Sequence, residues 1–389
     1  MKAHICWQRA RSGLWFPLFL AVLAATLPGA VRAQTVDTPA PFAYLMDLSS
    51  DTVLMEKQAD VPTAPASMSK MMTILMVLER LKAGTLSLDD TFPVSRKAWE
   101  KGGSKMFVEV DTRVSVDDLL HGIIVQSGND ACIVIAEGLA GTEEAFAADM
   151  TARAQELGLD DSHFVNSTGW PAENHVMSAR DLAKLAQILI EEFPDYYPLF
   201  AEETFTYNDI TQKNRNPVLS VEIGADGLKT GHTEASGYGL TASAKRGDRR
   251  LVLVLNGLES ATQRAREAER LLEWGFRSFV GVTLFDAQGL VEEAPVWLGE
   301  RASVPLVLED KLAVTMPRPS SRQMQVSIRY DAPIPAPIRK GDRLGTLRVT
   351  APGFETVERP LIAGADVGAL GPVGRVLSVA QHWLGRVLP

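Results

Sequence analysis

The sequence is poor in cysteine and histidine, and it has no excess of positive charge. Its 389 residues include only two cysteines and six histidines, too few to suggest the clustered ligands of a structural zinc site. The formal net charge is −9, with 48 acidic against 39 basic side chains. Nucleic-acid binding needs a basic face. We therefore expect neither a metal site nor a nucleic-acid partner.

The N-terminus carries an apolar run that does not suit a folded domain. Residues Leu14–Leu27 are interrupted only by Pro17 and Thr26. The run is preceded by three basic residues, Lys2, Arg9 and Arg11. Small or compact residues occupy the positions before Ala33 that a signal peptidase recognises when it cleaves after this residue. The pattern predicts a secretory signal peptide over residues 1–33 and hence an exported protein. An uncleaved membrane anchor is the alternative, which the helix-breaking Pro28-Gly29 disfavours. Cys6 leaves with the signal, so Cys132 has no intrachain disulfide partner.

The length exceeds one ordinary core and predicts two domains. After a lead-in over residues 34–41, residues 42–280 combine strand and helix periods, which predicts an α/β (α+β) domain. The expected strands are Ala43–Asp47, Thr52–Glu56, Gly227–Gly231, Tyr238–Ala244 and Leu251–Leu255. The expected helices begin near Ser67 and then cover residues 115–139, 142–157, 178–193 and Thr262–Phe279.

Beyond residue 285 a helical period is lacking and proline is frequent. Four short strand candidates predict a small all-β domain over residues 285–366. They are Val304–Leu308, Leu312–Met316, Gln325–Tyr330 and Leu344–Val349.

Residues 367–389 return to a helical period. One face is apolar, with Leu370, Val373, Leu377, Ala380, Leu384 and Leu388. The other is polar, with Arg375, Ser378, His382 and Arg386. The charges make the segment a poor membrane span, and it suits a helix lying on the membrane surface. A helix docked on its own β domain is the alternative.

A serine and a lysine open the first apolar helix, in the tetrad Ser67-Met68-Ser69-Lys70. They lie one turn apart, so both side chains share a helix face. Burial disfavours a charged ammonium, which would let Lys70 take the Ser67 proton. The tetrad alone is weak, because about one is expected by chance in such a chain. The same tetrad would be found if Ser67 only capped the helix and Lys70 extended its ammonium to solvent.

Two further motifs are each ambiguous. Ser127-Gly128-Asn129 lies between apolar helical segments, where a hydroxyl and an amide can face a cleft or simply cap a helix. Lys229-Thr230-Gly231 lies in a predicted strand, where the glycine permits close approach of a ligand. The lysine could equally protect an exposed strand edge from aggregation.

Taken in order, S-x-x-K, S-x-N and K-T-G resemble the penicillin-recognising serine enzymes. The flanking sequences are similar to those of the low-molecular-mass D-Ala-D-Ala carboxypeptidases of peptidase family S11. The matching stretches are Pro65–Thr73, Ser127–Cys132, Asn166–Gly169, Ser178–Ala183, Asp226–Thr233, Arg266–Glu269 and Leu272–Phe276. The resemblance covers nearly the whole chain and implies a serine β-lactamase/transpeptidase-like catalytic domain, a β-rich C-terminal domain and a terminal amphipathic helix.

The resemblance also implies roles for individual residues. Ser67 would attack the carbonyl between the two terminal D-alanines of a peptidoglycan peptide, with Lys70 as general base. Ser127 would pass a proton to the departing D-alanine, without metal or organic cofactor. The substrate-binding set would be Asn129, Lys229, Thr230, Gly231, His232 and Arg266. Backbone N–H groups of Ser67 and near His232 would stabilise the oxyanion.

Two departures separate the sequence from a class A β-lactamase. Gly128 replaces the aspartate of S-D-N, and no Glu-x-x-Leu-Asn stretch supplies a deacylating carboxylate. We therefore expect β-lactam antibiotics to acylate Ser67 and to leave slowly. A DD-endopeptidase, a β-lactamase and an inactive peptidoglycan-binding protein remain alternatives to a carboxypeptidase. A thiol nucleophile at Cys132 is disfavoured, since its helix is apolar and no histidine is near in sequence.

The two ends of the chain predict a location. The signal peptide implies export to the periplasm, and residues 367–389 would hold the protein peripherally on the outer face of the inner membrane.

Overall fold

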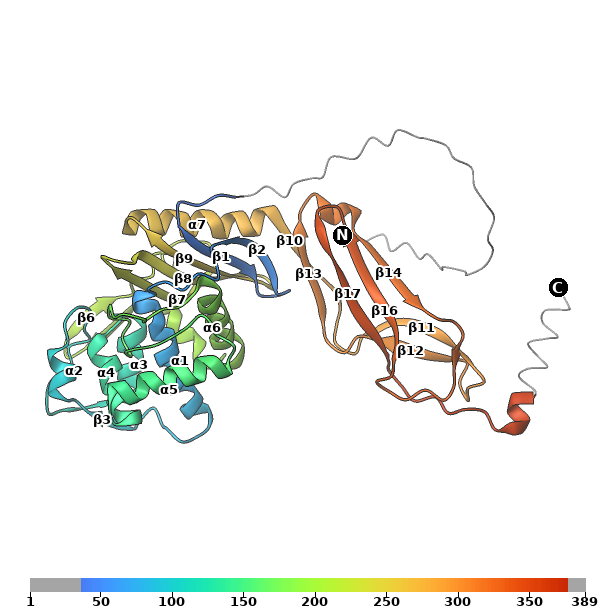
Figure 1. The fold of residues 1–389 in the computed structure, drawn as a ribbon, viewed down its shortest axis with the longest axis horizontal. Coiled ribbons are helices and arrows are strands. Elements are labelled where there is room, and N and C mark those ends of the chain that lie inside the picture. Colours follow the sequence, from blue (N-terminus) through green and yellow to red (C-terminus); the bar gives the residue numbers. More distant parts are fainter. Residues whose placement is uncertain (1–35, 377–389) are drawn as a thin grey trace. The chain divides into compact units, whose positions relative to one another are not determined.

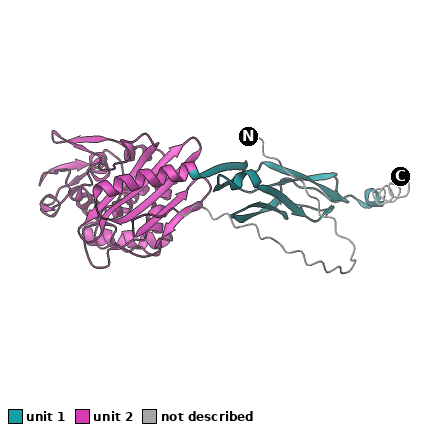
Figure 2. Cartoon of the chain, turned by 90° about the horizontal axis from the view of Figure 1, so that it is seen from above, with its two compact units in different colours: residues 1–34, 278–389 teal, residues 35–277 magenta. Residues whose placement is uncertain are grey.

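The structure is a computed structural model that describes residues 36–376. The predicted signal peptide, the first two lead-in residues and residues 377–389 of the predicted terminal helix lie outside the described residues. The chain divides into two compact units between Arg277 and Ser278 (Figure 2). Each unit has an apolar core of its own.

A five-stranded sheet forms the centre of the first unit. Its strands are β1 (Phe42–Asp47), β2 (Thr52–Lys57), β7 (Ala225–Thr233), β8 (Gly237–Arg246) and β9 (Arg249–Leu258). The order is β2-β1-β9-β8-β7, and all neighbours are antiparallel. β1 pairs with β9, so the two ends of this unit's sequence meet in the middle of the sheet, and β7 is left at an edge.

Helices cover both faces of this sheet (Figure 1). Side chains alternate along each strand: Leu45 packs with the core under α7 (Ala261–Ser278), and Tyr44 with the core on the opposite face. That opposite face carries α1 (Lys70–Lys82), α3 (Val116–Ile124), α4 (Asn129–Ala140), α5 (Glu143–Glu156) and α6 (Ala179–Glu192). The predicted α/β (α+β) catalytic fold is confirmed.

Smaller elements complete the first unit. They are η1 (Ala66–Ser69), β3 (Thr91–Pro93), α2 (Arg96–Glu100), β4 (Arg113–Ser115), η2 (Tyr197–Ala201), β5 (Thr204–Tyr207) and β6 (Ile210–Lys213). Caps set several helix starts: the Ser115 hydroxyl accepts from the Asp118 amide, and the Ser178 hydroxyl accepts from the Asp181 amide. The helical region predicted over residues 115–139 is two helices, α3 and α4, separated by a turn.

The second unit is all β, as predicted. β10 (Phe279–Phe285) pairs with β13 (Leu312–Pro317). The remaining strands form a sheet in the order β14-β16-β17-β12-β11-β15. They are β11 (Leu290–Trp297), β12 (Ser303–Val307), β14 (Gln325–Tyr330), β15 (Ile334–Pro335), β16 (Arg343–Ala351) and β17 (Phe354–Ala363), with the short helix η3 (Ser320–Gln323) between β13 and β14.

The junction between the units lies earlier than the sequence suggested. Helix α7 ends at Ser278 and β10 begins at Phe279, whereas the domains were predicted to end at residue 280 and to begin at residue 285. Strand β17 was not predicted, because Pro360 and its charged residues obscure the strand period.

The terminal helix was predicted from residue 367, but Val367 is buried in the β unit and Val367 and Ala369 form β-bridges with it, so the helix begins only at residue 372. Val373 and Val376 are 74% and 71% exposed there, so neither valine packs against the β unit. Within residues 36–376, no helix is both long and apolar enough to cross a membrane.

Candidate active site

The predicted nucleophile lies in a tight turn at the start of the central helix. Ala66 has a φ of 49°, a left-handed conformation that is unusual for alanine. The chain then passes through η1 directly into α1, which is buried along its first nine residues. The result is a half-buried Ser67 whose hydroxyl faces Lys70, with 2.9 Å between Oγ and Nζ.

Lys70 is fully buried and surrounded by oxygen acceptors. Its ammonium donates to Ser67 Oγ at 2.9 Å, to Asn129 Oδ1 at 2.8 Å and to the carbonyl of Thr168. Asn129 Nδ2 donates to the Gly102 carbonyl, which fixes the orientation of the amide. Burial lowers the pKa of Lys70 to about 8, so a minor but appreciable part of the lysine is neutral near physiological pH.

The second motif occupies the turn between α3 and α4. Ser127 has a φ of 63°, is 2% exposed, and its hydroxyl has no hydrogen-bond partner among the described residues. A buried hydroxyl without a partner is costly and is typical of a group that meets a ligand. Asn129 opens α4 and carries the acceptor for Lys70.

The glycine in this motif has a packing reason. A Cβ on Gly128 would lie 3.0 Å from the Asp130 carboxylate and 3.2 Å from the Gly122 carbonyl. That carboxylate accepts from the amides of Met106, Phe107 and Val108, so it cannot easily give way. An aspartate at position 128 would crowd this site and place two carboxylates together.

The third motif lies on the edge strand β7, beside the nucleophile turn. A Cβ on Gly231 would lie 2.8 Å from the Pro65 carbonyl and 3.1 Å from Ala66 Cβ, so only glycine fits this contact. Lys229 and Thr230 are 2% and 6% exposed. Burial, together with the charge of Lys70, lowers the pKa of Lys229 well below its usual range.

His232 and Arg266 were also predicted to bind substrate. In the structure, His232 lies next to the third motif, whereas Arg266 lies away from all three. His232 is exposed at the end of β7 and stacks on Tyr238, with ring centroids 3.9 Å apart. Arg266 is exposed on α7 and is not brought to the motif residues. Arg264 is there instead: it is buried, it donates to the Gly239 carbonyl opposite Gly231, and its Nε has no partner among the described groups.

Helix geometry explains why the two arginines differ in position. The buried face of α7 comprises Arg264, Ala268, Leu271, Leu272, Gly275 and Phe276, at helical spacing. Arg266 is about 200° around the helix from Arg264 and faces solvent. In the sequence, Arg264 falls at helical spacing with the apolar residues of α7, and this spacing could have predicted that Arg264 is buried.

Arg264 and Lys229 are buried cations, and the exposed Arg215 lies near enough for its charge to act on both. Burial lowers the pKa of Arg264 first, and the charge of Arg215 lowers it further. Arg264 and Arg215 both contribute to the lowered pKa of Lys229. Mutually repelling cations held together in this way form a receptor for an anion.

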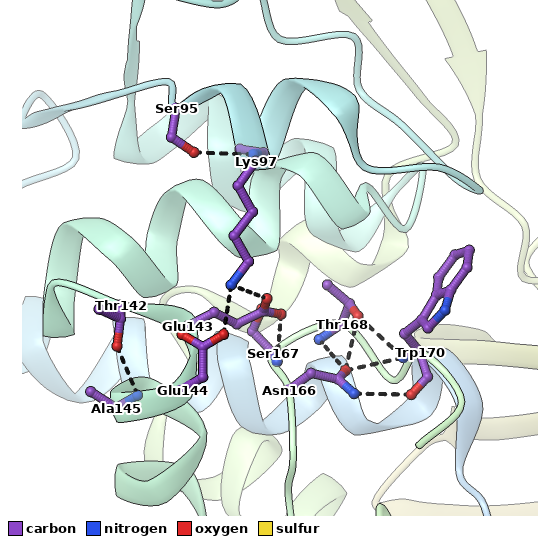
Figure 3. Close-up of polar contacts among 11 residues, drawn as sticks. Ser95, Lys97, Thr142, Glu143, Glu144, Ala145, Asn166, Ser167, Thr168 and Trp170 are labelled. Atoms are coloured by element: carbon purple, nitrogen blue, oxygen red, sulfur yellow. Dashed lines mark hydrogen bonds and ion pairs between the residues drawn. The ribbon is translucent and has the colours of Figure 1, made fainter.

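The loop over residues 166–170 contacts Lys70 through Thr168, and Figure 3 shows the hydrogen bonds that hold this loop in place. Asn166 Oδ1 accepts from the amides of Thr168 and Trp170, and Thr168 presents its carbonyl to Lys70. Glu143 accepts from the amide and the hydroxyl of Ser167 and forms an ion pair with Lys97 at 3.1 Å. The Glu143 carboxylate is thereby committed to holding the loop.

Within the described residues, no carboxylate is bonded to the three groups that would carry the chemistry. Among the residues that the structure describes, no aspartate or glutamate is hydrogen-bonded to Ser67, Lys70 or Ser127, and no group of three His, Cys, Asp or Glu side chains could hold a metal ion. Cys132 is fully buried in α4, and burial raises the pKa of its thiol to about 12. Such a thiol is protonated at neutral pH and does not act as a nucleophile.

A hollow of about 360 Å³ opens beside the nucleophile turn. It is lined by the turn itself, the loop that follows Gly169, and the end of β7. Trp170 is 41% exposed and lies at this hollow, with the Lys101 ammonium 4.2 Å from the centroid of its ring. A larger hollow of about 650 Å³ lies around Arg80 and Asp89, and neither hollow is lined by a residue of the three motifs themselves.

Comparisons with known proteins match both units of the chain. Residues 29–259 match the family described as D-alanyl-D-alanine carboxypeptidase, and residues 279–369 match the C-terminal domain of penicillin-binding protein 5. The D-alanyl-D-alanine carboxypeptidase DacC of Escherichia coli (strain K12) is 39% identical, over 94% of this chain and 95% of its own. DacA of the same strain is 34% identical, over 88% of each chain.

Solved structures agree with the sequence comparisons. Penicillin-binding protein 5 from Haemophilus influenzae superposes with a TM-score of 0.80 at 34% identity, covering 86% of this chain and 98% of that one. Penicillin-binding protein 6B from Escherichia coli gives a TM-score of 0.71 at 32% identity, over 85% and 96% of the two chains. The chain therefore belongs to the D-alanyl-D-alanine carboxypeptidase family, peptidase family S11, whose members are serine hydrolases.

Proposed function

We propose that this chain is a serine-type DD-carboxypeptidase that removes the terminal D-alanine from peptidoglycan peptides through an acyl-enzyme on Ser67. The observation that carries the proposal is the contact between Ser67 Oγ and Lys70 Nζ at 2.9 Å, inside a site that keeps part of the lysine neutral. A serine paired with a buried base is the arrangement that nucleophilic catalysis needs.

The partners of Lys70 give the direction of proton transfer. Asn129 Oδ1 and the Thr168 carbonyl can only accept hydrogen bonds. A neutral amine that donates its two protons to them turns its lone pair toward Ser67, the third partner and the only one of the three that can donate. Lys70 then takes the hydroxyl proton as Ser67 Oγ forms a bond to the substrate carbonyl carbon.

Ser127 and β7 account for the remaining steps. The unpartnered Ser127 hydroxyl would relay the proton held by Lys70 to the amine of the departing D-alanine. Water would then hydrolyse the acyl-enzyme, which releases the shortened peptide and restores the Ser67 hydroxyl. The cations Lys229 and Arg264, with Thr230 and His232, would bind the terminal carboxylate of the substrate. Because β7 is an edge strand, its outer backbone groups are available to the peptide, with Asn129 holding an amide of the substrate.

The rival activities differ in deacylation and in substrate. Glu143 is engaged with Ser167 and Lys97, so it is not free to activate a water against the acyl-enzyme. We therefore expect penicillin to form a long-lived adduct at Ser67, and rapid multiple turnover of penicillin would identify a β-lactamase. Cleavage of cross-linked dimers without release of terminal D-alanine would identify an endopeptidase.

The proposed activity is tested by D-alanine release. Residues 34–367 would be incubated with diacetyl-L-Lys-D-Ala-D-Ala, with Ser67→Ala as the matched control. One D-alanine per peptide is expected from the native sequence and none from the variant. Penicillin labelling without any D-alanine release would contradict the carboxypeptidase assignment and favour an endopeptidase or a peptidoglycan-binding protein.

The proposal extends to location. Residues 1–33 would direct export to the periplasm, and the helix that begins at residue 372 would lie on the outer face of the inner membrane. The exposed Val373 and Val376 support this over a helix docked on the β unit. Deleting residues 368–389 should leave turnover unchanged and release the protein from sedimenting membranes. Continued sedimentation of the truncated protein would refute the anchor.

A further inference from the structure

A buried histidine outside the three motifs connects two parts of the catalytic unit. His175 is 3% exposed and lies at the end of the loop that begins after Phe164, whose ring it meets edge-on at 5.8 Å. Its Nδ1 is 3.1 Å from the Val165 amide nitrogen, within the same loop. Its Nε2 is 3.1 Å from the hydroxyl of Ser69, in the nucleophile tetrad.

The direction of each hydrogen bond follows from the protonation of His175. Burial, followed by the charges of Lys70 and His163, lowers the pKa of His175 to about 4, so the ring is neutral at physiological pH. The Val165 amide can only donate, which makes Nδ1 the acceptor and places the ring proton on Nε2. Nε2 then donates to Ser69 Oγ, and Ser69 Oγ donates to the Ala66 carbonyl at 3.0 Å.

The chain of hydrogen bonds ends on the peptide that sets the position of the nucleophile. Ala66 is in the left-handed conformation and directly precedes Ser67. Its carbonyl is also enclosed by the loop, because a Cβ on Gly169 would lie 2.0 Å from the Ala66 oxygen and 2.7 Å from Ser69 Oγ. A strained residue persists only where its surroundings hold it, and here the holding groups are Ser69, His175 and the Gly169 backbone.

We propose that His175 is a positioning residue for Ser67, acting through Ser69 to hold the Ala66–Ser67 peptide in its reactive conformation. The inference rests on the proposed role of Ser67 as nucleophile. His175 itself touches neither Ser67 nor Lys70 through any hydrogen bond in the described structure, so it takes no part in proton transfer. Its loss should slow acylation while leaving the non-covalent binding of substrate largely intact, since misplacement of a nucleophile affects the reacting geometry.

Two amide substitutions separate this role from simple support of the loop. In His175→Asn, the side-chain oxygen can replace Nδ1 as acceptor for Val165, but nothing reaches Ser69. In His175→Gln, the side-chain nitrogen can replace Nε2 as donor to Ser69, whereas the bond to Val165 is lost. The matched control is His163→Asn, which changes an exposed histidine just before the loop; among the described residues its side chain is hydrogen-bonded to the Asn174 carbonyl and not to Ser69.

The measurement is the rate of penicillin acylation under saturating and sub-saturating conditions, together with the melting temperature. We expect the saturating acylation rate of His175→Asn to fall about 10- to 100-fold with little change in half-saturating concentration. His175→Gln should recover most of that rate even if its melting temperature is as low, and His163→Asn should resemble the native protein. Equal loss in the Asn and Gln variants, in proportion to stability, would show a purely structural histidine.

A second variant keeps the test decisive if His175→Asn folds poorly. Ser69→Ala removes the link to Ala66 at its other end and leaves the histidine in place. The double variant Ser69→Ala/His175→Asn should acylate no more slowly than the slower single variant, because both break the same chain. Additive losses would overturn the inference. If the native protein is not acylated at Ser67 at all, the proposed function fails instead, and the two failures are thus distinct.

Discussion

The two units bury different kinds of side chain. The α/β unit buries two lysines and an arginine, Lys70, Lys229 and Arg264, around one serine. In the β unit, within the part of the chain that the structure describes, the buried polar side chains are only Thr315 and Ser320, and the core is aliphatic. Burying cations without carboxylate partners costs stability. The difference shows that the first unit gives up stability for reactive groups and that the second carries no such cost.

Removing the nucleophile would test this comparison most severely. Ser67→Ala should reduce turnover by about 10³-fold or more and abolish penicillin labelling, since no other described hydroxyl contacts Lys70. The melting temperature should change little, because Ser67 is only half-buried. D-alanine release and covalent labelling, measured on the same preparation, check both statements. Substantial residual labelling would place the nucleophile elsewhere.

The pH dependence should report the buried base. Lys70 accepts a proton only when neutral, so the acylation rate should rise with pH, about tenfold per pH unit, and level off above its pKa of about 8. Stopped-flow acylation by penicillin between pH 5 and 9.5 measures this profile. Lys70→Arg should be inactive throughout the range, because arginine stays protonated. A flat profile for the native protein would mean that Lys70 is not the base.

Arg264 and Arg266 offer a matched pair on one helix. Arg264→Ala should raise KM for a peptide with a free terminal carboxylate about 10- to 100-fold, the effect of losing one charged hydrogen bond. Arg266→Ala should change KM by less than about twofold, since its side chain faces solvent. Steady-state kinetics on the two variants decide between them. A larger effect at Arg266 would support the prediction made from the sequence and contradict the role proposed for Arg264.

A substitution in the core of the β unit should lower the stability of that unit without changing turnover. Leu347→Ala, at a fully buried position, should lower the free energy of unfolding of this unit by about 2–5 kcal/mol. Turnover at 25 °C should remain within about twofold of the native value. Calorimetry paired with D-alanine release measures both. A parallel loss of activity would show that the β unit contributes to the catalytic site.

The sequence predicted those parts of the catalytic unit that depend on local patterns, such as strand periodicity and short motifs. Periodicity located the neighbouring strands β2, β1 and β9 of the central sheet. The order of the motifs predicted that Ser67, Lys70 and Asn129 share one site, and in the structure hydrogen bonds join Lys70 to the other two. Tertiary contacts with no short-range signature were missed. The carbonyl of Thr168 reaches Lys70 across 98 residues, and His175 reaches Ser69 across 106. The left-handed Ala66 is equally invisible, because alanine rarely takes that conformation without tertiary support.

The lysine's third acceptor has a consequence for how the protein can vary. Lys70 is held at Thr168 by a main-chain carbonyl and not by the threonine side chain. Every amino acid carries that oxygen, so mutation of codon 168 can loosen the loop but cannot delete the acceptor. Drift at this position, or selection by a β-lactam, can therefore reshape the wall of the cleft without removing the hydrogen bond that keeps the base in place.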